Sequence, residues 1–312
     1  MKIVFMGTPD YAVATLEALI NAGHDVAAVF AQPDKPVGRK QILTPPPVKI
    51  CAQKHSIPVF QPHTLRDGQA AGILGNIKPD IIVVVAYGKI LPEDILSAAK
   101  YGCVNGHASL LPKYRGASPI QWCIVCGETK TGVTVMQMDK GMDTGDILKT
   151  AEVRIGDNET AEELFERLSV LTAELMTETL SAIEKREIVP VKQDDSKASY
   201  APIIKKEMAL LDFSKSAREV YNAVRGYYSW PCAYFFLNGK RIKVIKAEIG
   251  SGSSLKPGSV ADNKDNLEIA CADGSSVKIT VLQPEGSKQM TARQFLNGNR
   301  IDIGTVVGEN NG

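Results

Sequence analysis

The sequence contains no run of about 18 uninterrupted apolar residues, the minimum for a membrane-spanning helix. Its apolar start, Met1 to Gly7, is short and is interrupted by Thr8-Pro9-Asp10, so we expect a first strand there and not a signal peptide. Net charge is also nearly absent, at +1, which excludes a strong global attraction to nucleic acid but not a local basic surface. A reduced, cytoplasmic setting is the default expectation.

Cysteine is sparse, with six residues in 312, and its spacing is irregular. A chain of this length does not need disulfide staples. Cys123 and Cys126 form one C-x-x-C pair, but no second Cys/His pair stands at zinc-finger spacing, so we expect two small buried helix residues. The acidic run from Asp139 is similar to a calcium loop, yet its twelfth residue is Thr150, where an EF-hand needs glutamate. No metal is expected.

Short β-branched runs alternate with helical patterns through the first two-thirds of the chain, which predicts an α/β domain. The run from Asp80 to Ala86 is apolar on both faces, as in a central parallel strand. We therefore predict an open, mostly parallel Rossmann-like sheet with helices on both faces. The first turn, Gly7 to Asp10, lacks G-x-G-x-x-G and contains Pro9, which disfavours a nicotinamide cofactor. Further strands are expected at 3–6, 25–31, 57–61, 103–105 and 133–138.

The pattern of alternating strands and helices ends with a long Glu-rich helix expected over 157–187. A polar, proline-bounded run follows and is interpreted as an interdomain linker. Beyond it, one helix and about five short strands with Gly-containing turns predict a small C-terminal OB-like β-barrel, with a β-sandwich as the alternative. The expected domains are therefore 1–189, a linker at 190–205, and 206–312.

Two segments that follow expected strands carry groups suited to acyl transfer. Asn105 and His107 lie in one, and Asp143 lies in the other. Ligands bind beyond the carboxyl ends of strands in such sheets, so we expect these segments to meet at one rim. The Asn105 amide would donate to an oxyanion, the His107 imidazole would shuttle a proton, and Asp143 would orient it. On residue types alone, a structural histidine and a plain acidic loop remain the alternative.

These segments closely resemble the methionyl-tRNA formyltransferase family. The resemblance rests on Ile3 to Asp10, His107 to Gln121 and Gly132 to Asp146, and it extends to Ser229-Trp230-Pro231 and Gly239-Lys240-Arg241 in the second domain. It implies the fold of a formyltransferase N-terminal domain followed by a tRNA-binding domain. It also implies that the catalytic trio consists of Asn105, His107 and Asp143.

The resemblance further implies the ligands. The formyl donor would be 10-formyltetrahydrofolate, with no metal, and the acceptor would be the α-amine of methionyl-initiator tRNA. The segment that contacts the folate would consist of Ser109, Leu110, Leu111 and Pro112, with Val85 to Leu91 and Asp139 to Asp146 lining the pterin pocket. The expected protein is a monomer without a membrane partner.

The segment 32–49 is unusually long for an α/β connection, which suggests a functional loop. Lys35, Arg39 and Lys40 would contact phosphates of the tRNA acceptor stem. Ile42 or Leu43 would insert at an unpaired terminal base step of that stem. Without the resemblance, a solvated proline-rich loop is the favoured interpretation. A second basic cluster is expected on one strand of the C-terminal domain, at Lys240, Arg241, Lys243 and Lys246.

One residue departs from the family pattern. Gly106 stands where the family usually has a branched apolar residue, and a glycine is expected to loosen the backbone between Asn105 and His107. Two alternatives to the tRNA enzyme are therefore kept. One is a formyltransferase that acts on a nucleotide-sugar or purine-precursor amine. The other is a tRNA-binding protein with a decayed site.

Overall fold

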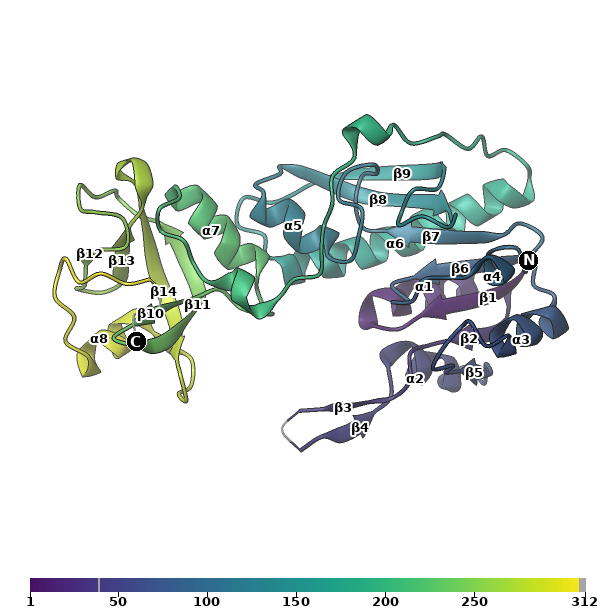
Figure 1. Cartoon of the computed structure of the whole chain (residues 1–312), viewed down its shortest axis with the longest axis horizontal. Coiled ribbons are helices and arrows are strands. Elements are labelled where there is room, and N and C mark those ends of the chain that lie inside the picture. Colours follow the sequence, from purple (N-terminus) through teal and green to yellow (C-terminus); the bar gives the residue numbers. More distant parts are fainter. Residues whose placement is uncertain (39, 309–312) are drawn as a thin grey trace. The chain divides into compact units, whose positions relative to one another are not determined.

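The computed structural model describes residues 1–38 and 40–308, which group into two compact units (Figure 1). Among these residues no helix is long and apolar enough to cross a membrane. The first unit comprises 1–119, 130–154 and 165–201, and the second comprises 120–129, 155–164 and the chain from 202 onward. This division differs from the expected one, because two internal segments join the second unit and residues 190–201 of the expected linker pack with the first.

The first unit is built on a seven-stranded sheet with the order β5-β2-β1-β6-β7-β8-β9. The strands from β5 to β7 are parallel, as predicted, whereas β8 and β9 are antiparallel to their neighbours. The bounds in sheet order are β5 (Val59–Phe60), β2 (Asp25–Phe30), β1 (Lys2–Gly7), β6 (Ile81–Val85), β7 (Cys103–His107), β8 (Lys130–Gln137) and β9 (Ile147–Arg154).

Helices cover both faces of this sheet. On one face α3 (Gln69–Ile77) and α4 (Glu93–Leu96) share an apolar cluster with every second residue of β1, at Val4 and Met6. On the other face α1 (Asp10–Asn21) packs against α6 (Ala161–Glu184), where the Tyr11 hydroxyl lies 2.7 Å from that of Thr172. The helix α2 (Pro47–Lys54) packs beside α1. Successive residues of β1 thus point to opposite faces of the sheet, and each face is covered by its own layer of helices.

The long segment between β2 and α2 is not an irregular loop. It forms an antiparallel hairpin of β3 (Lys35–Val37) and β4 (Ile42–Thr44), which extends away from the sheet (Figure 1). The large side chains on it are exposed, with Ile42 at 62% and Leu43 at 65%. We call residues 32–46 the arm. Strand pairing defines its course even though little of it is buried.

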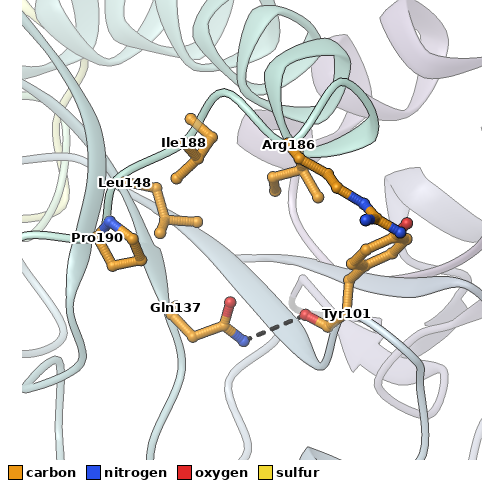
Figure 2. A pocket seen from close by; sticks show the side chains of 7 residues that line it. Tyr101, Gln137, Leu148, Arg186, Ile188 and Pro190 are labelled. Atoms are coloured by element: carbon orange, nitrogen blue, oxygen red, sulfur yellow. Dashed lines mark hydrogen bonds between the residues drawn. The ribbon is translucent and has the colours of Figure 1, made fainter.

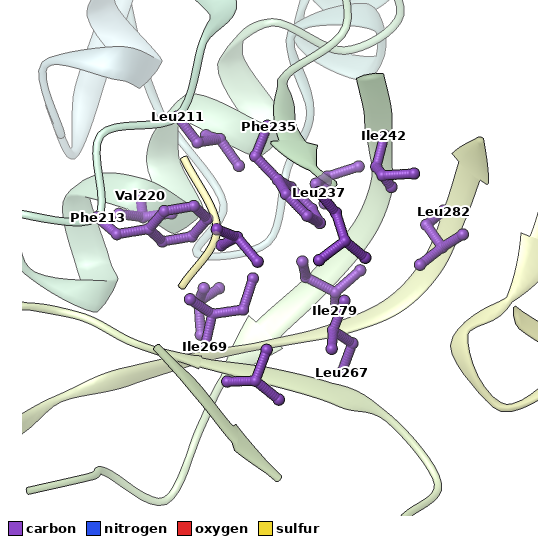
Figure 3. Packing of buried hydrophobic residues seen from close by; sticks show 14 of the residues in the cluster. Leu211, Phe213, Val220, Phe235, Leu237, Ile242, Leu267, Ile269, Ile279 and Leu282 are labelled. Carbon is purple, nitrogen blue, oxygen red and sulfur yellow. The ribbon is translucent and has the colours of Figure 1, made fainter. Parts of the chain in front are cut away.

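The second unit contains a six-stranded antiparallel sheet around one apolar core (Figure 3). Its edge strands β10 and β12 are both hydrogen-bonded to residues 304–308, through Phe236 and Val260, so this last segment joins the two edges. A closed, barrel-like arrangement results, and its kinship to the OB fold stays a prediction. The strands are β10 (Tyr234–Leu237), β11 (Lys240–Ile249), β14 (Ser276–Pro284), β13 (Leu267–Ala270), β12 (Val260–Asp262) and β15 (Met290–Thr291).

The helices of this unit have clear local causes. A capping box between Ser216 and Glu219 starts α7 (Ala217–Gly226), and Thr291 with Gln294 forms another at α8 (Ala292–Gly298). The second unit also contains most of α5 (Pro119–Val125) and the 3-10 turns η2 (Lys206–Ala209) and η3 (Ala272–Gly274), whereas the 3-10 turn η1 (Asp195–Lys197) belongs to the first unit.

A buried arginine explains why residues 155–164 belong to the second unit. Arg225 on α7 donates to the carbonyls of Gly156 and Glu159 at 3.3 and 3.0 Å. In α5, Cys123 is buried but Cys126 is exposed, so the expectation of two buried cysteines was wrong for the second. Cys126 lies at the end of the short helix, beyond the face that packs.

Candidate active site

Strand β7 carries two of the three predicted catalytic residues. Asn105 and His107 are two positions apart in extended backbone and therefore project from the same face of the sheet. The strand is paired with β6 on one side and β8 on the other, which fixes the direction of both side chains. Among the described residues the Asn105 amide has no hydrogen-bond partner, and it is partly exposed, so it remains available as a donor.

Gly106 faces the opposite side, toward α6. A Cβ atom at this position would lie 2.6 Å from Cγ2 of Thr172, closer than real contacts allow. The methyl group of Thr172 thus fills the space that a side chain at position 106 would need. Gly106 is paired with Val135 of β8 and lies close to α6, and whether it loosens the backbone stays a prediction.

His107 is oriented by a backbone carbonyl. Its ring is almost fully buried, at 6% exposure, and Nε2 lies 2.9 Å from the carbonyl oxygen of Tyr114. A carbonyl oxygen only accepts hydrogen bonds, so Nε2 must carry a proton. The other ring nitrogen, Nδ1, faces Asp143, whose Oδ2 lies 3.7 Å away. Nε2 is therefore occupied by the hydrogen bond to Tyr114, and Nδ1 is left to accept and release a proton.

Asp143 reaches the site by a route that strand polarity does not predict. Because β8 is antiparallel, its last residue, Gln137, pairs with Val104 near the start of β7. The loop 138–146 then folds back toward His107. Gly145 permits the fold, since a Cβ there would lie 1.7 Å from the carbonyl oxygen of Gln137. Asp143 itself has a φ of 55°, and its Oδ2 accepts the backbone N–H of Gly116 at 2.8 Å.

A buried glutamine from the expected linker holds this loop in place. Gln193 donates from Nε2 to the carbonyls of Asp143 and Gly145, at 2.9 and 2.7 Å. Its Oε1 accepts from Nε and Nη2 of Arg115, at 3.1 and 2.8 Å. We call Arg115 and Gln193 the clasp. Sequence reasoning missed it, because a single glutamine in a polar run carries no pattern.

The segment predicted to contact folate divides into two kinds of residue. Ser109 and Leu111 are buried, and the Ser109 hydroxyl donates to the carbonyl of Lys113 at 2.7 Å. Leu110 and Pro112 are partly exposed. The hydroxyl of Ser109 thus supports the turn, and the apolar side chains of Leu110 and Pro112 remain to meet a ligand.

The segment 85–91 follows the central strand β6. Tyr87 is buried, its hydroxyl has no hydrogen-bond partner among the residues that the structure describes, and burial raises its pKa to about 12, so the phenol stays neutral. Lys89 donates back to the carbonyls of Pro62 and His63. Burial, and secondarily the nearby Lys35, lowers the pKa of this lysine. The arm and this segment therefore begin close together in space.

The predicted tRNA-contacting residues lie on the arm and away from the trio in sequence. Lys35 and Lys40 are exposed, and Arg39 lies outside the described residues. At the base of the arm, Lys49 pairs with Asp34 at 2.8 Å, which fixes where the hairpin leaves the domain.

A cavity of about 180 Å³ lies elsewhere in the first unit (Figure 2). Gln137 stands on its wall and donates to the carbonyl of Cys103 at 2.9 Å. None of the trio lines this cavity, so it is not the proposed site. Its walls are formed by Tyr101, Gln137, Leu148, Ile183, Arg186, Ile188 and Pro190.

Comparison with known families agrees with this geometry. Residues 1–180 match the family described as "Formyl transferase", and residues 203–300 match "Formyl transferase, C-terminal domain". The fold is thus that of a formyl transferase. Methionyl-tRNA formyltransferases of Citrifermentans bemidjiense and Alkaliphilus oremlandii are each 48% identical to the chain, over 99% of its length and 97% and 100% of theirs. The chain belongs to the methionyl-tRNA formyltransferase family.

Solved structures share the fold at lower identity. An N-formyltransferase of Helicobacter canadensis, in complex with folinic acid and dTDP-3-aminofucose, superposes with a TM-score of 0.70 at 22% identity, over 89% of this chain and 98% of that one. The methionyl-tRNA formyltransferase of Clostridium thermocellum superposes with a TM-score of 0.58 at 21% identity, over 81% and 95%. The same architecture therefore serves enzymes with different acceptors.

Proposed function

We propose that this chain transfers the formyl group of 10-formyltetrahydrofolate to the α-amine of methionyl-initiator tRNA. The proposal rests on the near full-length identity to enzymes of that name. The placement of Nδ1 of His107 3.7 Å from the Asp143 carboxylate is the observation that carries it for this chain. Folate-bound relatives of the same fold support the donor. Charged initiator tRNA is used by translation, so we propose a cytoplasmic enzyme, acting as a monomer.

The reaction places defined demands on the trio. It forms a bond between the amine nitrogen and the formyl carbon, breaks the bond from that carbon to the folate nitrogen, and moves one proton between the two nitrogens. The Asn105 amide donates to the oxygen that becomes negatively charged. Nδ1 of His107 takes the proton from the amine and returns it to the leaving nitrogen. Asp143 stabilises the imidazolium in between.

We place the proposed donor site beside the trio. Leu110 and Pro112 offer an apolar contact beside His107, and segments 85–91 and 139–146 form the walls of the pterin pocket. Because the clasp fixes loop 139–146 and the sheet fixes β6, both walls rest on rigid elements.

The acceptor side has two candidate surfaces. On the arm, Lys35 and Lys40, together with Arg39, meet phosphates, and the exposed Ile42 and Leu43 supply the apolar contact. In the second unit the register of β11 shifts between Val244 and Ala247, a bulge that leaves the polar side chains before and after it on the outer face. The second basic cluster consists of these outward residues, Arg241, Lys243 and Lys246, together with the exposed Lys240 at the start of the strand.

The assignment is tested by formylating charged initiator tRNA and separating the products on acid gels. His107→Ala and Asp143→Ala should each lower turnover by about 10²–10⁴-fold while tRNA binding and the circular dichroism spectrum stay unchanged. Near-normal turnover in both variants would remove the trio from the mechanism.

The acceptor is tested separately. The same enzyme is offered charged initiator tRNA, a nucleotide-linked amino sugar and a purine-precursor amine with the same donor. Formylation of the tRNA alone supports the proposal, and a faster reaction with either small amine overturns it. The alternative of a decayed site predicts tRNA binding with no transfer to any acceptor.

A further inference from the structure

Three side chains that the proposed reaction does not use converge between α1 and α2. They are Glu17, Cys51 and His55, and one potential ligand atom from each lies within 4.8 Å of those from the other two. Cys51 is buried at 4% exposure, whereas Glu17 and His55 are exposed. The thiol is thus held by packing, and the two other groups border solvent.

We propose that Glu17, Cys51 and His55 form a binding site for a zinc-type divalent cation. Cys51 and His55 are one helical turn apart at the end of α2, so both face the same side. The carboxylate of Glu17 comes from the helix packed against them. Thiolate, imidazole and carboxylate are the ligand types of zinc, and three protein ligands leave a fourth position for water.

The distances suit this coordination. At zinc bond lengths, two ligands of a tetrahedral site lie about 3.3 to 3.6 Å apart. Sγ of Cys51 already lies 3.8 Å from Oε1 of Glu17. Only the exposed side chains of Glu17 and His55 need to rotate to bring all three atoms to one centre, since the thiol is fixed. The buried ligand therefore anchors the site, and the mobile ligands close it.

The charges also balance. A thiolate and a carboxylate together neutralise a divalent cation, and the C-terminal end of a helix, where His55 stands, favours positive charge. Without a cation, burial and then the charge and hydrogen bond of Glu17 raise the pKa of the Cys51 thiol, so the thiol keeps its proton. Binding forms the sulfur–metal bond and releases that proton to solvent.

A bound cation would join α1 to the C-terminal end of α2, the helix that follows the arm. The helix α2 begins at Pro47, directly after the arm ends at residue 46. The cation would therefore act as a brace for the element that presents the arm, at a place separate from the trio.

The test is a metal titration of the full chain. The protein is stripped with a chelator, kept reduced and titrated with Co²⁺, which reports thiolate ligation by charge-transfer absorption in the near ultraviolet. We expect one equivalent to bind with such a band, and Zn²⁺ to displace it and raise Tm. Cys51→Ser should abolish the band, and His55→Gln should weaken binding by more than the roughly 10–100-fold effect of losing an outer-shell partner.

The matched controls are Cys126→Ser and His63→Gln, which remove an exposed cysteine and an exposed histidine elsewhere. Both should bind Co²⁺ as the parent does. A parent without a charge-transfer band, a band that survives in Cys51→Ser, or one that disappears in Cys126→Ser would overturn the proposal. Serine is nearly isosteric with cysteine and His55 is exposed, so unchanged circular dichroism is expected in both test variants.

Discussion

The side-chain amide of Gln193 donates to the backbone carbonyl of Asp143 at 2.9 Å, across fifty positions of sequence. The same amide reaches Gly145, and its oxygen is held by Arg115. Asp143 therefore owes its place to a residue from a part of the chain that was expected to be a linker. Gln193 is therefore a positioning residue for the loop that carries Asp143, whose catalytic role is proposed above.

The first prediction concerns the clasp. Gln193→Glu keeps the acceptor for Arg115 but loses both donors to the loop, so kcat for formylation should fall by about 10²-fold with smaller changes in either KM. Steady-state kinetics with each substrate varied would measure this split. Asp195→Asn is the control, since it alters only the exposed partner of Arg115, and its activity should match the parent. A kcat within twofold of the parent in Gln193→Glu would contradict the role of the clasp.

The second prediction concerns the packing beneath β7. Gly106→Ala should destabilise the protein by about 1–3 kcal/mol, because the new methyl group meets Cγ2 of Thr172. Thr172→Ser removes that methyl group and keeps the hydroxyl that meets Tyr11. In the double variant most of the cost should disappear. Urea unfolding of the four proteins gives the coupling energy, and additive effects would show that the contact is not the cause.

The third prediction concerns the tautomer of His107. Since Nε2 donates to the Tyr114 carbonyl, the neutral ring should be protonated at Nε2 and not at Nδ1. Nitrogen chemical shifts of labelled histidine, assigned by comparison with His107→Gln, would measure it. A ring protonated at Nδ1 would mean that the nitrogen facing Asp143 is not free to accept a proton.

The fourth prediction concerns pH and the base of the arm. Hydrogen bonds from Lys49, and then from Gln61, hold the pKa of Asp34 below its usual range. A carboxyl whose pKa is lower in the folded state stabilises the fold above its unfolded pKa, and this contribution disappears as the pH falls through the folded value. Asp34→Asn should therefore lower stability at neutral pH and make little difference in acid. Urea unfolding at both conditions is the measurement, and an equal loss at both would refute the prediction.

Much of the secondary structure of the first unit could be predicted from the sequence, because its central strands are continuous apolar runs. The run at 80–86 predicted β6, which spans Ile81–Val85, and the strand expected at 25–31 matches β2, which spans Asp25–Phe30. By contrast, β9 was missed, since its residues Ile147–Arg154 alternate between half-buried and exposed and none is fully buried. Edge strands carry a weaker hydrophobic signal than central ones.

The sequence predicted that His107 and Asp143 would meet, as they do at 3.7 Å, but it did not predict the contacts that support them. Asn105 and His107 follow a recognisable strand, and the motif around Asp143 is distinctive. Strand polarity predicted the wrong route for Asp143, because β8 runs antiparallel and the loop must return. The carbonyl of Tyr114 and the clasp are backbone and long-range contacts, and neither leaves a pattern in local sequence.

The position of the clasp also has a consequence for biosynthesis. A nascent chain carries all three proposed reacting side chains once residue 143 has been made, but the hydrogen bonds from Gln193 to the loop can form only after residue 193 has left the ribosome as well. The support that Gln193 gives to the loop is thus delayed, by fifty residues of translation, relative to the synthesis of the three side chains.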